Sequence, residues 1–109
     1  MDNIRILVAN EPRSYREVIA AVVHELRPHA EVITVEPADL DREVVHLEPH
    51  LVLCSRLTEV VETRTLAWVL LYPDGEARAA ISIAGQRRTV PDIAFCSLLS
   101  IVDQTEQLA

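Results

Sequence analysis

The sequence predicts an α/β domain whose parallel central sheet is extended by an antiparallel C-terminal hairpin. In the first half, short apolar runs alternate with segments in which apolar residues recur every three or four positions. In the second half, a Pro-Asp-Gly turn at residues 73–75 lies between an apolar run and a segment of alternating apolar residues. With 109 residues, 50% of them hydrophobic, the chain can form one compact domain over residues 1–109.

The first half predicts three strands and two helices. Residues 4–9 are apolar except for one arginine, which indicates a strand covered on both faces. After Pro12, apolar residues at three- and four-residue steps predict an amphipathic helix that Pro28 ends. Residues 31–35 and 51–54 are two further strands, with a second helix between them. Right-handed crossovers make this order a parallel sheet with helices on its faces.

The second half departs from this alternation. Residues 57–65 are polar and β-branched, and they form either a loop or a short irregular helix. Residues 66–72 predict a fourth buried strand, followed by a tight turn over residues 72–75. Residues 78–84 then alternate between apolar and polar side chains, which predicts a strand returning antiparallel to the fourth.

A further turn and a last helix complete the predicted fold. Gly85 makes the turn, and residues 86–90 can add an edge strand, although the sequence leaves this pairing open. Pro91 opens a final helix that reaches about Gln104 and is expected to pack on the sheet. The chain therefore has three main helices in this interpretation.

Two motifs point to a particular family. The tripeptide NEP at residues 10–12 directly follows the first strand, and the run PHLVLCS at residues 49–55 forms the third strand and its end. Together with the strand and helix order over residues 4–57, these motifs resemble the first half of a response-regulator receiver domain, which has a flavodoxin-like fold. The resemblance implies a three-layer, receiver-like arrangement.

The resemblance also implies that the phosphorylation chemistry of receivers is lost. Asn10 and Glu11 stand where receivers carry two acidic Mg²⁺ ligands, so one carboxylate of the two is retained. Ser55 stands in place of the phospho-accepting aspartate, and a serine hydroxyl without an adjacent base is a poor nucleophile. The chain contains no lysine, so the lysine with which receivers detect the phosphoryl group is also missing.

The polar residues of this region are expected to form a crevice. The first and third strands are neighbours in this topology, so Asn10, Glu11, Ser55 and Arg56 should meet at the carboxyl ends of the strands, where such folds bind ligands. Arg56 could act as the positive partner of Glu11 or bind a small anion. The simpler interpretation is a surface ion pair worth at most about 1 kcal/mol.

Composition and charge exclude several classes of function. The formal net charge is −7, and the only basic cluster is Arg87-Arg88, so a nucleic-acid partner is not expected. No apolar run is long enough to span a bilayer and no leader pattern precedes the first strand, which predicts a cytoplasmic protein without a membrane partner.

No motif indicates an enzyme, a metal or a cofactor. The chain lacks a glycine-rich phosphate loop and a nucleophile elbow. The four histidines form two pairs along the chain, and a proline separates the members of each pair. The pairs are His24 with His29 and His46 with His50, and neither has the spacing of zinc ligands. Cys54 and Cys96 lie among apolar neighbours and are predicted to be buried free thiols.

The predicted last helix suggests an interface. Its apolar residues cover more than one stripe, and those proposed for an interface are Phe95, Leu98, Leu99, Ile101 and Val102. A helix that packs on one sheet face needs a single stripe. The surplus either lies beneath the antiparallel hairpin or faces a second subunit.

These observations lead to two functional hypotheses. The first is a non-catalytic pseudo-receiver, an interaction module in signalling or regulation that binds a protein and is expected to form a homodimer. The alternative is a small-molecule or anion-binding domain that uses the crevice at the carboxyl ends of the first and third strands.

Overall fold

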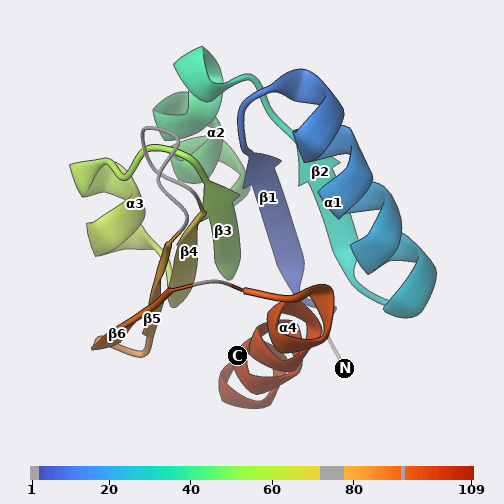
Figure 1. The fold of residues 1–109 in the computed structure, drawn as a ribbon. Helices are drawn as coiled ribbons and strands as arrows, with labels where there is room; N and C mark the ends of the chain where they lie inside the picture. The colour runs from blue at the N-terminus through green and yellow to red at the C-terminus, as the bar shows by residue number, and fades with distance from the viewer. Residues whose placement is uncertain (1–2, 72–77, 92) are drawn as a thin grey trace.

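The protein has a six-stranded mixed sheet with α-helices on both faces (Figure 1). The computed structural model describes residues 3–71, 78–91 and 93–109, and all of their side chains except that of Phe95. The strand order is β2-β1-β3-β4-β5-β6. The predicted α/β class, the mostly parallel sheet and its antiparallel C-terminal extension are confirmed.

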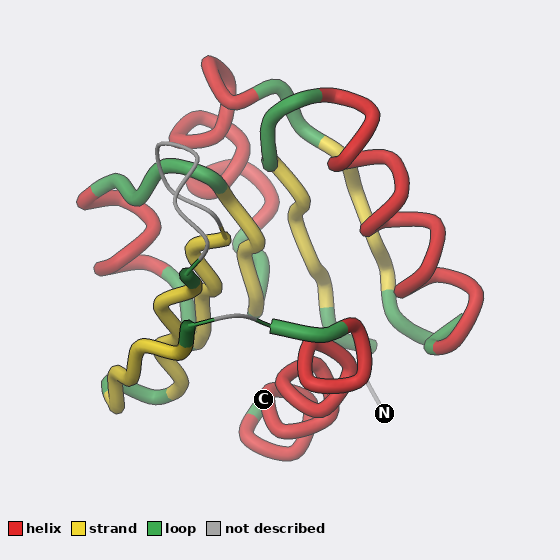
Figure 2. The backbone as a smooth tube through the Cα atoms, in the orientation of Figure 1, coloured by secondary structure: helices red, strands yellow, loops and turns green. Residues whose placement is uncertain are grey.

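Four parallel strands form the first part of the sheet. They are β1 (Arg5–Ala9), β2 (Glu31–Thr34), β3 (Leu51–Cys54) and β4 (Ala67–Leu71). The connections between them each contain a helix (Figure 2), as parallel pairing requires. All four residues of β3 are buried, which explains why this strand appears in the sequence as an unbroken apolar run.

An antiparallel hairpin extends the sheet beyond β4. Strand β5 (Ala79–Ile83) pairs antiparallel with β4, and β6 (Gln86–Val90) pairs antiparallel with β5. Ala84 and Gly85 join β5 to β6 and have φ values of 52° and 84°, as a two-residue type I′ turn requires. Residues 86–90 are therefore the edge strand that the sequence left open. The turn predicted at residues 72–75 falls outside the described residues.

Two helices cover each face of the sheet. Helices α1 (Arg13–Leu26) and α4 (Phe95–Leu108) lie on one face, while α2 (Leu40–Leu47) and α3 (Glu59–Arg64) lie on the other, with a 3₁₀ turn at Pro37–Asp39 before α2. In the described part of the chain, the short helix α3 is added to the three main helices that the sequence predicted.

The fourth helix, α3, occupies the segment that the sequence left open as a loop or a short helix. It is short because Thr65 returns to an extended conformation directly before β4. Thr58 caps its start, since the Oγ1 atom accepts a hydrogen bond from the backbone N–H of Val61 at 3.2 Å.

The last helix lies further along the chain than predicted. It begins at Phe95 and ends at Leu108, instead of running from Pro91 to Gln104. Ala94 is extended, with φ −87° and ψ 159°, so Pro91 lies before the helix instead of opening it. At the other end no helix-breaking residue follows Gln104, and the polar residues after it continue the helix.

The core consists of two apolar layers, one on each face of the sheet. Alternate residues of β1 contribute to different layers, because side chains of a strand point to opposite faces in turn. The layer under α1 and α4 contains Ile6, Val8, Ile19, Val23, Leu98, Ile101 and Val102. The layer under α2 and α3 contains Leu7, Ala9, Val44, Val52, Val61 and Trp68. Both layers contact the central strands, so the sheet is buried on both sides.

Ion pairs join α4 to the end of α1. The guanidinium of Arg27 donates to both carboxylate oxygens of Asp103, from Nε at 2.7 Å and from Nη2 at 2.8 Å. His29 Nε2 lies 2.6 Å from Glu106 Oε2 on the next turn of α4. The hydrogen bonds from Arg27 hold the pKa of Asp103 below its ordinary value, and the same pair raises the pKa of Arg27.

The burial of α4 predicts a large cost for truncating its inner face. Ile101 is 1% exposed, so Ile101→Ala leaves a cavity and is expected to lower the free energy of unfolding by about 2–5 kcal/mol. Leu108 lies on the same helix but is 55% exposed, so Leu108→Ala is the matched control and should change stability little. Urea unfolding of both variants measures the difference. Equal effects would mean that α4 does not pack as described.

The pairing of Asp103 predicts a pH-dependent contribution to stability. Since its folded-state pKa is depressed, the contribution is present above the unfolded pKa of about 3.9 and is lost as the pH falls through the folded value. Asp103→Asn should therefore lower the urea midpoint at pH 7, and the difference from wild type should disappear in strong acid. Asp39→Asn is the control, for which we expect a smaller change in the urea midpoint. Among the described residues, the carboxylate of Asp39 pairs with Arg42, three residues away. A difference that persists in acid would contradict this role of the charge.

Candidate functional site

The carboxyl ends of β1 and β3 bring the predicted site residues together. Ala9 is paired with Cys54 in the parallel register, so the residues that follow each strand are neighbours at one edge of the sheet. The Ser55 hydroxyl oxygen accepts a hydrogen bond from the backbone N–H of Glu11 at 2.9 Å and a longer one from Asn10 Nδ2 at 3.4 Å. Asn10, Glu11 and Ser55 therefore form one hydrogen-bonded cluster.

The contacts of Ser55 position its side chain without activating it. Both hydrogen bonds use the oxygen as an acceptor, which leaves its own hydrogen available as a donor. Among the described residues, no histidine or carboxylate is hydrogen-bonded to the hydroxyl. A serine nucleophile needs such a base to remove its proton. The hydroxyl can therefore bind a ligand group through polar contacts.

Asn10 is the most constrained residue of the cluster. Its side chain is 0% exposed, and its Oδ1 atom has no hydrogen-bond partner among the described residues. Leaving a buried amide oxygen unpaired costs on the order of 1–3 kcal/mol. A polar group at this cost commonly marks a site where water or a ligand group completes the hydrogen bonding.

Arg16 of α1 contacts the cluster, although arginine is rarely buried. It is only 4% exposed. Its Nη1 donates to the backbone oxygen of Asn10 at 3.4 Å, and its Nη2 pairs with Glu36 Oε1 at 3.2 Å. The spacing to Ile19 and Val23, three and seven residues later, puts Arg16 on their buried helix face and could have revealed its position.

A cavity of about 230 Å³ opens above this cluster. Segments following β1 and β3 and the start of α2 surround it, and the lining residues are Ala9, Glu11, Pro37, Ala38, Leu40, Ser55, Arg56 and Thr58. Thr58 Oγ1 donates to Asp41 Oδ1 at 2.6 Å, which ties the start of α3 to α2 at the rim of the cavity. The crevice expected from the topology is thus present as a small hollow.

The charges at the rim differ from the expected ion pair. Glu11 and Arg56 both line the cavity and both are exposed, yet no salt bridge joins these two described residues. Each contributes one charge of opposite sign to the opening. The rim therefore has no strong preference for a cation or an anion from its net charge alone.

Among the described residues no histidine lines this cavity, and Cys54 lies on β3 directly before Ser55. Within the described residues, no group of three or more His, Cys, Asp and Glu side chains could hold a metal ion. His50 is part of the scaffold, because its Nδ1 accepts the backbone N–H of Arg5 at 2.9 Å. Both cysteines are free; Cys54 is buried, which raises the pKa of its thiol to about 12. Cys96 is exposed on α4, so the prediction that it is buried was wrong.

The residues proposed for an interface are mostly part of the core. Leu98, Ile101 and Val102 are buried against the sheet, and Leu99 is half-buried. The side chain of Phe95 lies outside the described set. The broad apolar surface of the last helix is therefore largely used within the chain, because α4 contacts both the sheet and α1. These three buried residues offer no free surface to a second subunit.

No helix in the described part of the chain is long and apolar enough to cross a membrane. Comparison of the chain with protein-family models, with curated proteins and with solved structures finds no match. The functional argument therefore depends on the geometry of the fold and the cluster around Ser55.

Proposed function

We propose that the protein is a pseudo-receiver: a non-catalytic, receiver-like module of signalling or regulation that binds a partner protein. The observation that carries this proposal is the position of Ser55. It follows β3, meets the segment after β1 through the hydrogen bond to Glu11, and so stands where a receiver would carry its phospho-accepting aspartate.

The strand order supports the receiver-like part of the proposal. The order β2-β1-β3-β4 agrees with that of flavodoxin-like doubly wound folds, in which the ligand site lies at the β1 and β3 carboxyl ends. Helices on both faces agree with the same architecture. A fold alone does not define a function, so the residues of the site must carry the rest.

The fifth strand supports the loss of phosphorylation. In a receiver the fifth strand is parallel to the others and the lysine follows its carboxyl end. Here β5 is antiparallel to β4, so its carboxyl end at Ile83 lies beside Ala67, at the amino end of β4 and on the opposite edge from Ser55. A residue that follows β5 therefore cannot reach the site, even if it were a lysine.

The crevice favours a second candidate, a small-molecule or anion-binding domain. Its support is the cavity of about 230 Å³ that Ser55 and Arg56 line, together with the hydrogen bond from buried Asn10 to the Ser55 hydroxyl. Inorganic phosphate is a suitable first probe, because Arg56 at the rim could pair with it. Stabilisation of the wild-type protein by phosphate, lost in Arg56→Ala, would favour this candidate.

Restoring the missing carboxylate tests the pseudo-receiver proposal. Ser55→Asp introduces a second carboxylate beside Glu11, so the variant should be destabilised without metal and should gain several degrees in melting temperature with millimolar Mg²⁺. Ser55→Asn has the same size without the charge and is the matched control, for which no gain is expected. Thermal unfolding with and without Mg²⁺ measures both. The proposal fails if the two variants respond alike.

Self-association is tested by the mass of the protein in solution. The sequence predicted a homodimer from the apolar surplus of the last helix, but Leu98, Ile101 and Val102 are buried in the chain itself. We therefore expect a monomer and a partner of a different kind. Light scattering on a sizing column at two well-separated loading concentrations measures the mass. A dimer that persists on dilution would contradict this expectation and favour the homodimer that the sequence predicted.

A further inference from the structure

The outer edge of β6 is unpaired among the described strands. It is the last strand of the sheet and pairs only with β5. Ile83 and Gln86 flank the two-residue turn and form a hydrogen-bonded pair, so hydrogen-bonded and non-hydrogen-bonded pairs alternate along β6 from there. By this alternation the N–H and C=O groups of Arg87 and Thr89 point away from β5. They form a free row of backbone donors and acceptors.

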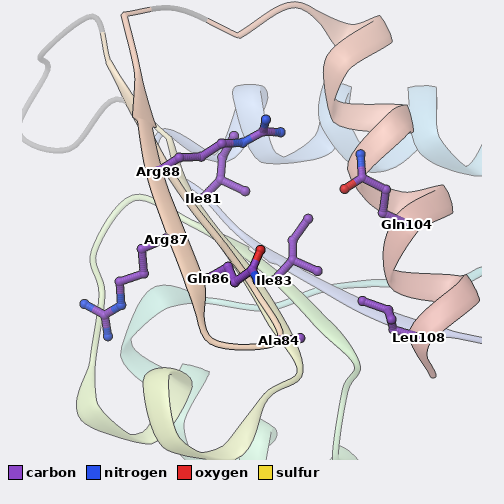
Figure 3. A pocket seen from close by; sticks show the side chains of 8 residues that line it. All are labelled: Ile81, Ile83, Ala84, Gln86, Arg87, Arg88, Gln104 and Leu108. Atoms are coloured by element: carbon purple, nitrogen blue, oxygen red, sulfur yellow. The ribbon is translucent and has the colours of Figure 1, made fainter.

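The two arginines of β6 lie on opposite faces of the hairpin. Arg87 extends over Trp68, 5.2 Å from the ring centroid, and pairs with Glu62 at 2.9 Å. Arg88 lies on the other face, over Ile81 and directed towards α4 (Figure 3). Within the described part of the protein, Arg88 is exposed and makes no ion pair. Its charge is available to a partner.

A groove of about 560 Å³ lies beside Arg88, between the hairpin and the C-terminal half of α4 (Figure 3). Ile81 and Ile83 of β5 form its apolar floor. Gln104 and Leu108 of α4 form the opposite wall, and Leu108 is 55% exposed there. Among the described residues, this edge of the sheet therefore combines outward backbone groups that no strand pairs, a positive charge without an ion pair, and apolar surface.

The charge of β6 indicates what can bind to it. The chain has a net charge of −7, yet the sequence of β6 is QRRTV, with two arginines and no acidic residue. Antiparallel pairing of β6 with β6 of a second copy would bring arginines close to arginines, which is unfavourable. Basic side chains on an edge strand are a common protection against such self-pairing. The same charges attract an acidic segment.

We propose that β6 binds an extended acidic segment of a partner protein by strand addition. The segment hydrogen-bonds the outward backbone groups of Arg87 and Thr89, and an acidic side chain on the groove face pairs with Arg88. Apolar side chains on that face cover Ile83 and Leu108. Backbone hydrogen bonds supply affinity and the alternate side chains supply specificity in this mode. This inference rests on the proposed function in one respect, that the protein is an interaction module.

Fluorescence anisotropy with a labelled ten-residue peptide tests the inference. Glutamate and valine alternate at its odd positions and threonine occupies its even positions, so that one face of the extended peptide carries both acidic and apolar side chains. The wild-type protein should bind it, and added salt should weaken the binding because charge contributes to it. Arg88→Glu should reduce the affinity about tenfold or more, since it replaces attraction by repulsion. Thr89→Pro should also reduce it, because proline removes an outward N–H that does not bond β5.

Three controls separate strand addition from unspecific attraction. Arg13→Glu makes the same charge change on exposed α1 and should leave the affinity unchanged. The peptide with lysine in place of glutamate should not bind. Single-stranded DNA of equal charge should bind much more weakly than the peptide. The amide resonances of residues 86–90 in the unmodified protein should shift on peptide addition, which tests the location without any variant.

The inference is overturned if the wild-type protein does not bind the peptide at low salt, if both β6 variants bind it normally, or if DNA binds equally well. The response of Ser55→Asp to Mg²⁺ tests the crevice around Ser55 and does not depend on β6. If that response appears while the peptide fails to bind, only the edge-strand inference is wrong. If the peptide binds at β6 but Ser55→Asp gains no response, the receiver-like assignment is wrong and the docking edge stands.

Discussion

The parallel pairing of β1 with β3 is the interaction on which the rest of the structure depends. Both strands are buried between helices on the two faces of the sheet, and each backbone polar group there must be satisfied by a neighbouring strand. The register that pairs Ala9 with Cys54 also determines that Asn10 and Ser55 emerge side by side. A shift of one residue would exchange the two core layers and separate the polar cluster.

The reversal of β5 has two consequences at opposite ends of the molecule. The carboxyl end of β5 lies away from Ser55, so the crevice is lined by residues that follow β1 and β3 and by the segment before α2. The reversal also requires a short turn and a sixth strand, and that strand becomes the exposed edge of the sheet. The antiparallel direction of β5 thus determines both which residues can reach the crevice and which strand is the exposed edge of the sheet.

The local patterns of the sequence predicted most helices and strands, but they did not predict the burial of every residue in them. Apolar runs, helical spacing and turn residues predicted five of the six described strands and the helices α1, α2 and α4, and left β6 open. The start of α4 was wrong because proline is compatible with the residues before a helix as well as with its first turn. The predicted burial of Cys96 was wrong because burial depends on which element packs over a residue, and residue type is only a weak guide to it.

The features of the candidate site also divide into those that the sequence determined and those that only the tertiary structure decided. By itself the sequence determined that polar residues follow the first and third strands, and that no lysine is available to them. Only the tertiary structure decided that Asn10 is buried with an unpaired oxygen, that Glu11 and Arg56 do not pair, and that the apolar surface of α4 belongs to the core. The physical reason is range: strand and helix patterns arise between residues close in the chain, whereas burial and pairing depend on residues brought together from distant segments.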